Sequence, residues 1–186
     1  MQLPKNLFAF LTSLFWLGLQ LANPLNTNAQ SMIITGHRGA AGHAPENTMI
    51  SIRKALEMGV DRVEIDVQQT SDAQIVALHD RSLDRTTPKK GKVSNYSWEE
   101  LKNIAADNDF PEEFPEARIP LLTEILDTIA RYDAKLLIEV KEGSSVYPGI
   151  EKRIVELVRS KNMTRQVILQ SFRDEVVDRF ISMNLE

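Results

Sequence analysis

Seven charged or imidazole side chains recur where short apolar segments of the sequence end. Carboxylates can bind a cation, imidazoles can transfer a proton near neutral pH, and basic side chains can bind an anion. Together these residue types are those of a reactive site rather than of a packed core. In chain order they are His37, Arg38, Glu64, Asp66, His79, Glu139 and Lys141.

Three of these residues are acidic. Glu64 and Asp66 alternate with apolar residues in the segment 63–67, and residues two apart on a strand share a face, roughly 7 Å apart. Glu139 lies in a similar segment. On a face closed against helices, three carboxylates would repel one another unless a cation lay among them. The chain contains no Cys, and oxygen ligands favour Mg²⁺ or Ca²⁺ over zinc.

Each part of this pattern also has a simpler interpretation. Alternating acidic and apolar residues are typical of a strand with one solvated face, and for residues 64–66 alone that is the better interpretation. His43, in a loop rich in Gly, Ala and Pro, is interpreted as structural. The functional interpretation is favoured because all seven residues fall at the ends of successive segments.

The elements that must position these residues alternate between strands and helices. Such alternation predicts a parallel sheet with helices outside it, doubly wound or closed as a barrel, with the site at the carboxyl ends of the strands. Residues 82–118 are polar, contain three Pro and are interpreted as an insertion. Strands are predicted at 31–35, 63–67, 75–78, 135–140 and 166–170, and helices at 47–58, 98–105, 121–132, 150–160 and 174–183.

Composition and charge exclude some classes of protein. With 186 residues, 42% of them hydrophobic, the chain can form one substantial core but not two full domains. A formal charge of −4 gives no basic surface for nucleic acid. Residues 7–22 are largely apolar, follow Lys5 and precede small residues, so residues 1–29 are predicted to be a signal peptide.

The apolar stretch is shorter than the ~20 residues that a membrane span needs. We therefore expect cleavage before Gln30, a secreted or periplasmic protein, and no stable membrane span afterwards.

Short motifs in a fixed order make the chain resemble the glycerophosphodiester phosphodiesterase family. They span roughly residues 32–173, and the ordered set is far more specific than any one motif. The resemblance implies that residues 30–186 form an α/β domain with a TIM-type (β/α)8 barrel fold of the phospholipase-C-like phosphodiesterase kind. The matching motifs are His37-Arg38-Gly39, Pro45-Glu46-Asn47-Thr48, Glu64-Ile65-Asp66-Val67, His79-Asp80, Leu83-Asp84-Arg85-Thr86-Thr87, Ile119-Pro120-Leu121-Leu122, Ile138-Glu139-Val140-Lys141 and Ser171-Phe172.

The resemblance also implies an activity, the metal-dependent hydrolysis of glycerophosphodiesters to glycerol 3-phosphate and an alcohol. One divalent cation, Ca²⁺ or Mg²⁺, would bind the small-molecule phosphodiester substrate. By motif, the cation ligands would be Glu64, Asp66 and Glu139. Glu46, in a neighbouring loop, would support these residues or contact the metal.

The remaining roles also follow from the resemblance. His37 and His79 would be the acid/base pair, and Arg38 and Lys141 would contact the phosphate. One histidine would deprotonate the nucleophile while the other protonates the leaving alcohol. The nucleophile would be water, or the substrate's own glycerol hydroxyl through a cyclic phosphate.

The sequence departs from the family pattern in two respects. Ala73 stands where the family usually has Gly, which would cost about 1 kcal/mol if that position needs a positive φ. A complete barrel takes about 250 residues, whereas five strands are predicted here, so we expect a barrel truncated to about five strands and incomplete at its C-terminus. Two alternatives follow, a lysophospholipase D-like phosphodiesterase and a non-catalytic truncated remnant.

Overall fold

The computed structural model describes residues 32–110 and 113–183. The predicted signal peptide, residues 1–29, lies outside the described residues. None of the helices in the described part of the chain has the length and apolarity that crossing a bilayer requires.

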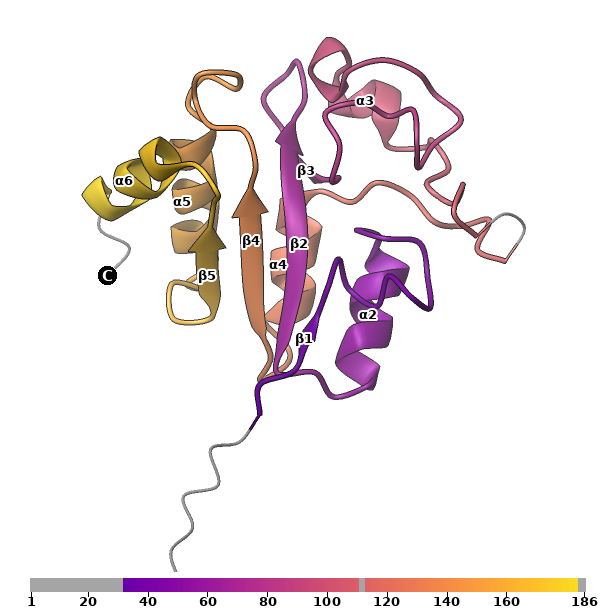
Figure 1. The fold of residues 1–186 in the computed structure, drawn as a ribbon, viewed down its shortest axis with the longest axis horizontal. Helices are drawn as coiled ribbons and strands as arrows, with labels where there is room; N and C mark the ends of the chain where they lie inside the picture. The colour runs from indigo at the N-terminus through magenta and orange to yellow at the C-terminus, as the bar shows by residue number, and fades with distance from the viewer. Residues whose placement is uncertain (1–31, 111–112, 184–186) are drawn as a thin grey trace, which may run out of the picture. The chain divides into compact units, whose positions relative to one another are not determined.

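Four parallel strands form the framework of the described fold (Figure 1). Their order in the sheet is β1-β2-β4-β5, so β4 lies between β2 and β5. This parallel sheet with its helices is the α/β arrangement predicted for a TIM-type barrel. The strands are β1 (Thr35–Gly36), β2 (Arg62–Gln69), β4 (Lys135–Val140) and β5 (Val167–Gln170).

The third predicted strand does not continue this parallel series. β3 (Ile75–Ala77) pairs with β2 antiparallel, with Val67 opposite Ala77. Residues 70–74 are too few for a parallel crossover, which takes about a dozen residues, so the chain folds back as a hairpin. Ala73 in this turn has φ 64°, which confirms the positive φ considered for it. The hairpin returns the chain to the site, because Leu78 N donates to Asp66 O at 3.0 Å.

The first strand is shorter and more exposed than predicted. It pairs with β2 only at Thr35 and Gly36, whereas a buried strand was expected over residues 31–35. Ile33 and Ile34 are more than half exposed, because β2 is the only strand paired with β1 among the described residues. The prediction of a buried strand at this position is wrong.

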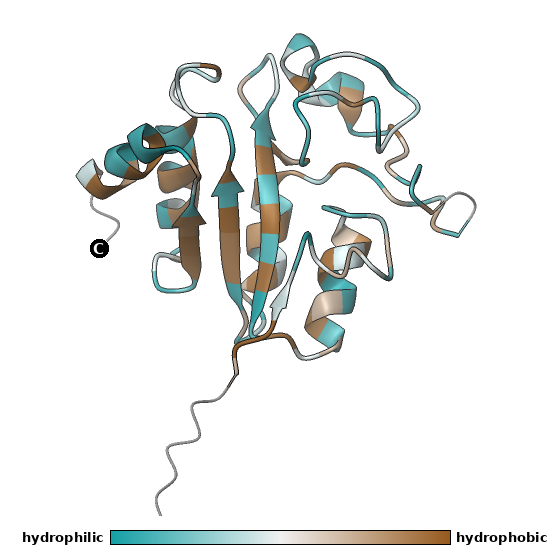
Figure 2. Ribbon diagram, viewed as in Figure 1, coloured by the Kyte–Doolittle hydropathy of each residue, from teal (hydrophilic) through white to brown (hydrophobic). Residues whose placement is uncertain are grey.

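The helices cover one face of the sheet and leave the acidic residues of β2 and β4 on the other. Alternate residues of both strands are fully buried in the main core (Figure 2). On β2 and β4 these core residues are Val63, Ile65, Val67, Leu136, Ile138 and Val140. The helices are α2 (Met49–Glu57), α4 (Leu122–Ile129), α5 (Ile150–Ser160) and α6 (Asp174–Ser182), with the short α3 (Trp98–Leu101) and η1 (Val93–Asn95).

The segment between β3 and α4 has a small core of its own. Leu83, Val93 and Leu101 are fully buried there and pack with Val76 of β3. This packing fixes the segment beside the carboxyl ends of the parallel strands, next to the candidate site.

Candidate active site

Glu64, Asp66 and Glu139 meet on the face of the sheet opposite the helices. The register of β2 and β4 places Asp66 beside Glu139, and Glu64 lies two residues earlier on the same face. Each carboxylate offers an oxygen within 4.8 Å of the other two. The three residues are only 5%, 1% and 6% exposed, respectively. The structure therefore brings together the three predicted metal ligands, which we call the acidic triad.

The acidic triad has an electrostatic cost that a cation would relieve. Burial, together with the neighbouring charges of Asp66 and Glu139, raises the pKa of Glu64 to about 7 despite a hydrogen bond from the Arg38 amide. Glu64 Oε1 is buried and has no hydrogen-bond partner among the described residues. An all-oxygen donor set with an unpaired buried oxygen fits a hard divalent cation.

Lys141 and Arg38 are the basic residues nearest to the triad. Lys141 Nζ lies 2.6 Å from Glu139 Oε1 and 3.0 Å from Asp66 Oδ1, while Arg38 Nε lies 3.3 Å from Asp66 Oδ2. Burial alone would lower the pKa of Lys141, but its hydrogen bonds to the two carboxylates outweigh burial and raise it. The two predicted phosphate-binding residues are thus placed at the triad.

The loop between β1 and α2 holds Arg38 in an unusual conformation. Arg38 has φ 53°, and its amide donates to Glu64 Oε2 at 2.7 Å. Its carbonyl accepts hydrogen bonds from Ser51 Oγ and the Asn47 amide. Gly39, also with positive φ, packs so tightly on Ser51 that a Cβ would lie 2.5 Å from Ser51 Oγ. This loop therefore fits against α2 only with glycine at position 39.

Asn47 is a site residue whose role the sequence did not reveal. The residue that caps the following helix is Thr48, whose side chain accepts from Ser51 N. The buried Asn47 side chain instead pairs with Asp66 twice: Nδ2 donates to Asp66 Oδ2 at 3.0 Å, and Oδ1 accepts from Asp66 N at 3.1 Å. Only the sequence motif around Glu46, which includes Asn47, could have indicated that Asn47 belongs to the site.

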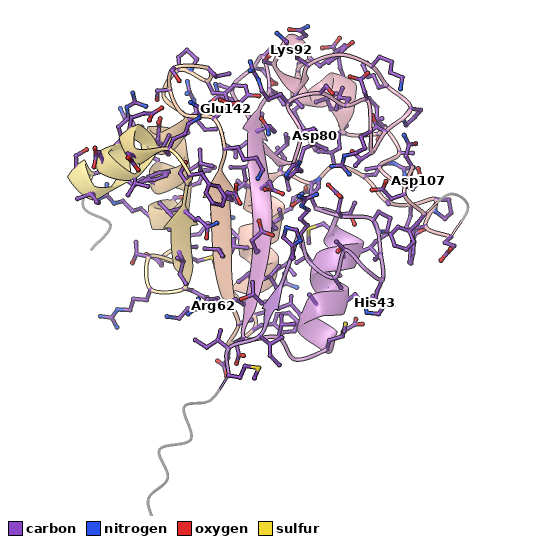
Figure 3. All side chains as sticks on the ribbon, viewed as in Figure 1. His43, Arg62, Asp80, Lys92, Asp107 and Glu142 are labelled. Atoms are coloured by element: carbon purple, nitrogen blue, oxygen red, sulfur yellow. The ribbon has the colours of Figure 1, made fainter. Side chains whose placement is uncertain are left out.

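The two predicted catalytic histidines differ in their surroundings. The His37 side chain is 71% exposed, and its Nε2 lies 3.9 Å from Glu64 Oε2. The His79 side chain is 28% exposed, and its Nδ1 lies 2.5 Å from Asp80 Oδ1. Asp80 lies toward the carboxyl ends of the strands, whereas His43 is exposed beside α2 (Figure 3).

Glu46 contacts two arginines. Burial would raise the pKa of Glu46, but hydrogen bonds and charges from Arg85 and Arg38 outweigh burial and lower it. Arg85 also donates to Asp80 at 2.8 Å. Arg85 belongs to one of the family motifs, but no role for it was predicted from the sequence.

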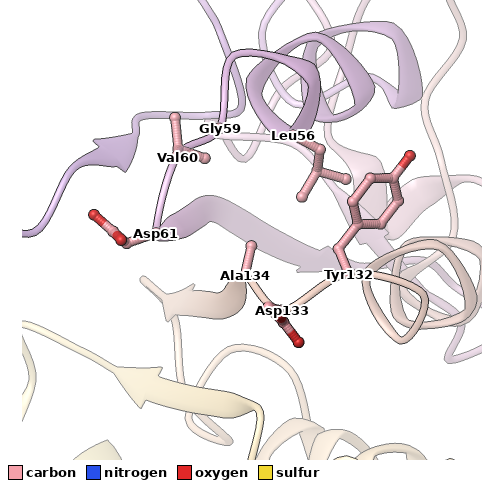
Figure 4. A pocket seen from close by; sticks show the side chains of 7 residues that line it. All are labelled: Leu56, Gly59, Val60, Asp61, Tyr132, Asp133 and Ala134. Carbon is pink, nitrogen blue, oxygen red and sulfur yellow. The ribbon is translucent and has the colours of Figure 1, made fainter.

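A separate cavity of about 330 Å³ lies at the opposite end of the strands (Figure 4). It is lined by Asp61, which precedes β2, by Ala134, which precedes β4, and by Tyr132. Sites of parallel α/β folds lie at the carboxyl ends of strands, and this cavity contains none of the predicted site residues.

Comparison with known proteins shows that the chain is similar to phosphodiesterases. The model of the glycerophosphoryl diester phosphodiesterase family matches residues 37–184. The glycerophosphodiester phosphodiesterase of Caldanaerobacter subterraneus subsp. tengcongensis is 39% identical over 140 residues, covering 75% of this chain and 58% of the relative.

Two solved structures share the fold. A glycerophosphodiester phosphodiesterase from Agrobacterium tumefaciens superposes with a TM-score of 0.74 at 31% identity, covering 82% of this chain and 63% of the other. A phosphodiesterase from Oleispira antarctica, solved with the product sn-glycerol-3-phosphate, has a TM-score of 0.74 at 28% identity, covering 82% and 62%. The chain therefore spans less than two thirds of the length of these relatives.

Proposed function

Since the chain belongs to the glycerophosphoryl diester phosphodiesterase family, we propose that it hydrolyses glycerophosphodiesters to glycerol 3-phosphate and an alcohol. The observation that carries this proposal is the acidic triad, buried beside Lys141 and Arg38 at the carboxyl ends of parallel strands. Three carboxylates in such a place are costly unless they hold a cation.

The acidic triad would hold one divalent cation, Ca²⁺ or Mg²⁺. When bound, the cation supplies charge that stabilises the phosphoryl oxygens of the substrate. Lys141 and Arg38 add positive charge on the same side, where they can orient the phosphodiester and stabilise the negative charge that develops on it.

The two histidines supply proton transfer. Imidazole has an ordinary pKa of about 6.5, so that one ring can accept a proton while another donates one near neutral pH. His37 and His79 lie on separate segments, directly after β1 and shortly after β3. One would take the proton of the nucleophile, and the other would protonate the leaving alcohol.

The test is release of glycerol 3-phosphate from glycerophosphocholine, with Mg²⁺, with Ca²⁺ and with a chelator. We expect activity that depends on one of the cations, and loss of turnover in His37→Ala and His79→Ala by a factor of about 100 or more. Both variants should still bind the cation in calorimetry. His43→Ala is the matched control, because His43 is exposed and outside the site, and it should keep normal activity.

Three results would count against this proposal. No product with either cation would reject the proposed function. Loss of cation binding in His37→Ala or His79→Ala would show that the histidines are wrongly assigned. Faster turnover of lysophosphatidylcholine than of glycerophosphocholine would favour a lysophospholipase D-like activity instead.

We also propose that residues 1–29 direct export, on the strength of their apolar stretch and small-residue exit. N-terminal sequencing of the protein recovered from the periplasm or medium should begin at Gln30. Recovery of a chain that still begins at Met1 would contradict this.

A further inference from the structure

A continuous series of charged contacts links His79 to Arg38. His79 Nδ1 lies 2.5 Å from Asp80 Oδ1, and Arg85 Nε donates to Asp80 Oδ2 at 2.8 Å. Arg85 Nη1 and Nη2 donate to the two oxygens of Glu46 at 2.9 and 2.7 Å. Arg38 Nη1 donates to the same carboxylate at 3.1 Å. Arg85 is the link between a histidine and an arginine that both belong to the proposed site.

The geometry of these contacts requires a guanidinium group. Arg85 makes a bidentate pair with Glu46 and keeps its Nε for Asp80, which a planar group with several fixed donors can do. A lysine ammonium is a compact charge on a flexible stem and cannot hold both carboxylates in this arrangement. The structure thus explains an arginine at this position by its geometry and not only by its charge.

The backbone around Arg85 is itself fixed. The Thr87 amide and hydroxyl donate to the carbonyl of Leu83, whose side chain is fully buried. Asn108 Nδ2 donates to the Arg85 carbonyl at 3.1 Å. The segment between β3 and α4 therefore presents the guanidinium to the site from a rigid turn.

We propose that Arg85 is a positioning residue for two groups of the reaction, His79 through Asp80 and Arg38 through Glu46. A carboxylate only accepts hydrogen bonds, so Asp80 requires the proton of His79 on Nδ1. That tautomer leaves Nε2 free to exchange a proton with the substrate. Glu46, held between two guanidinium groups, fixes the side chain of Arg38 beside the triad.

The roles that we assign to Asp80, Glu46 and Arg85 rest on the proposed function, but their effect on His79 can be measured without it. Arg85 and Asp80 are both partly exposed. Since partly exposed ion pairs add little to stability, and the more buried Glu46 keeps its contact with Arg38, loss of the Arg85 side chain should affect the reaction more than folding.

The kinetic test separates the two contacts of Arg85, one with Asp80 and one with Glu46. Asp80→Ala should lower kcat about 10- to 100-fold, a typical cost for residues that orient a reactive side chain. Glu46→Gln should mainly raise KM for glycerophosphocholine, and Arg85→Gln should do both. The kcat of the double variant Arg85→Gln/Asp80→Ala should be no lower than that of Asp80→Ala alone, because both changes break the same contact, the one between Arg85 and Asp80.

Arg131→Gln is the matched control, since it removes one exposed arginine just beyond α4 and should leave both constants unchanged. If Arg85→Gln fails to fold, Arg85→Lys makes the same test. The lysine ammonium can bind only one of the two carboxylates, so Arg85→Lys should lower kcat or raise KM. Wild-type values for both constants in Arg85→Lys would overturn the proposal.

Nuclear magnetic resonance of the imidazole rings tests the positioning role independently of activity. The chain has three His, so the ring signals can be assigned with one His→Gln variant each. Arg85→Gln should shift the ring signals of His79 and leave those of His43 in place. An inactive wild type in which His79 still responds would reject the proposed function and support the positioning role. Unchanged His79 signals, or additive losses of kcat in the double variant, would overturn the positioning role.

Discussion

The environment of Glu64 is very different from that of a surface carboxylate. It is 5% exposed, shares its site with Asp66 and Glu139, and has a pKa raised to about 7. The ordinary pKa of a glutamate is 4.5. Because the pKa of Glu64 is higher than this, a proton competes with any cation for the carboxylate at neutral pH. Proton and cation binding at the triad should therefore be linked.

We therefore expect the affinity of the triad for Mg²⁺ or Ca²⁺ to fall below pH 7. The cation must displace the proton of Glu64 there, so affinity should drop by about tenfold per pH unit as the pH is lowered. Calorimetry between pH 5.5 and 8.5, in buffers of different ionisation enthalpy, would show the proton released. Glu64→Gln should bind the cation more weakly and without this proton release. An affinity that is constant over the whole range would contradict the prediction.

At the scale of elements, the loop before α2 is joined to β2 through Asn47. Asn47 has φ 56° and is almost fully buried, and its side chain satisfies both the amide and a carboxylate oxygen of Asp66. Asn162 also has a positive φ, 57°, but is exposed. The two asparagines share their backbone conformation and differ in what their side chains bind.

Replacing each of these two asparagines by alanine should show how much the contacts of Asn47 with Asp66 contribute to the free energy of unfolding. Asn162→Ala should cost about 1 kcal/mol, the penalty of a left-handed conformation. Asn47→Ala should cost about 2–4 kcal/mol, because the unpaired groups of Asp66 add about 1–3 kcal/mol to the same penalty. Urea denaturation with a chelator present measures both values. Equal losses in the two variants would show that the pairing with Asp66 contributes nothing.

The elements show which parts of the site the sequence could predict. Alternation along 63–67 correctly placed Glu64 and Asp66 on the face away from the core, because burial of one face fixes which side chains point where. The strand at 75–78 was predicted, but its antiparallel direction was missed because the side-chain pattern of a strand does not reveal its direction. The short connection 70–74 was the available signal. The pairing of Arg85 with Glu46 joins residues 39 positions apart, and no local pattern in the sequence encodes such a contact.

Across the described fold, the site is assembled from four separate segments. They are the loop between β1 and α2, strand β2, the turn after β3 and strand β4. The loop contributes His37 and Glu46, and the other three contribute Asp66, Arg85 and Glu139, respectively. The parallel register of β2 and β4 brings the carboxylates together. Because the triad joins two neighbouring central strands, its protonation and the binding of a cation to it should influence the stability of the described fold.

The sign of this influence follows from Glu64. Its pKa is higher in the folded protein than its ordinary value of 4.5, so between pH 4.5 and about 7 the folded state holds a proton that the unfolded state has lost. Without a cation, the free energy of unfolding should therefore fall as pH rises through this window. The carboxylates with lowered pKa lose their stabilisation only at more acidic pH and do not oppose this trend. They are Glu46, Asp72, Asp80, Glu100 and Glu151.

A bound cation should reverse the loss, since a ligand that binds only the folded state at 100 times its dissociation constant adds about 2.7 kcal/mol. Urea denaturation at pH 5 and pH 8, with chelator and with saturating Mg²⁺ or Ca²⁺, measures the effect. The cation should stabilise the wild type more at pH 8 than at pH 5. Glu64→Gln serves as the control, because it has no carboxyl proton to lose and should show a much smaller difference between the two pH values. A cation effect equal at both pH values in the wild type would mean that Glu64 does not hold its proton at neutral pH.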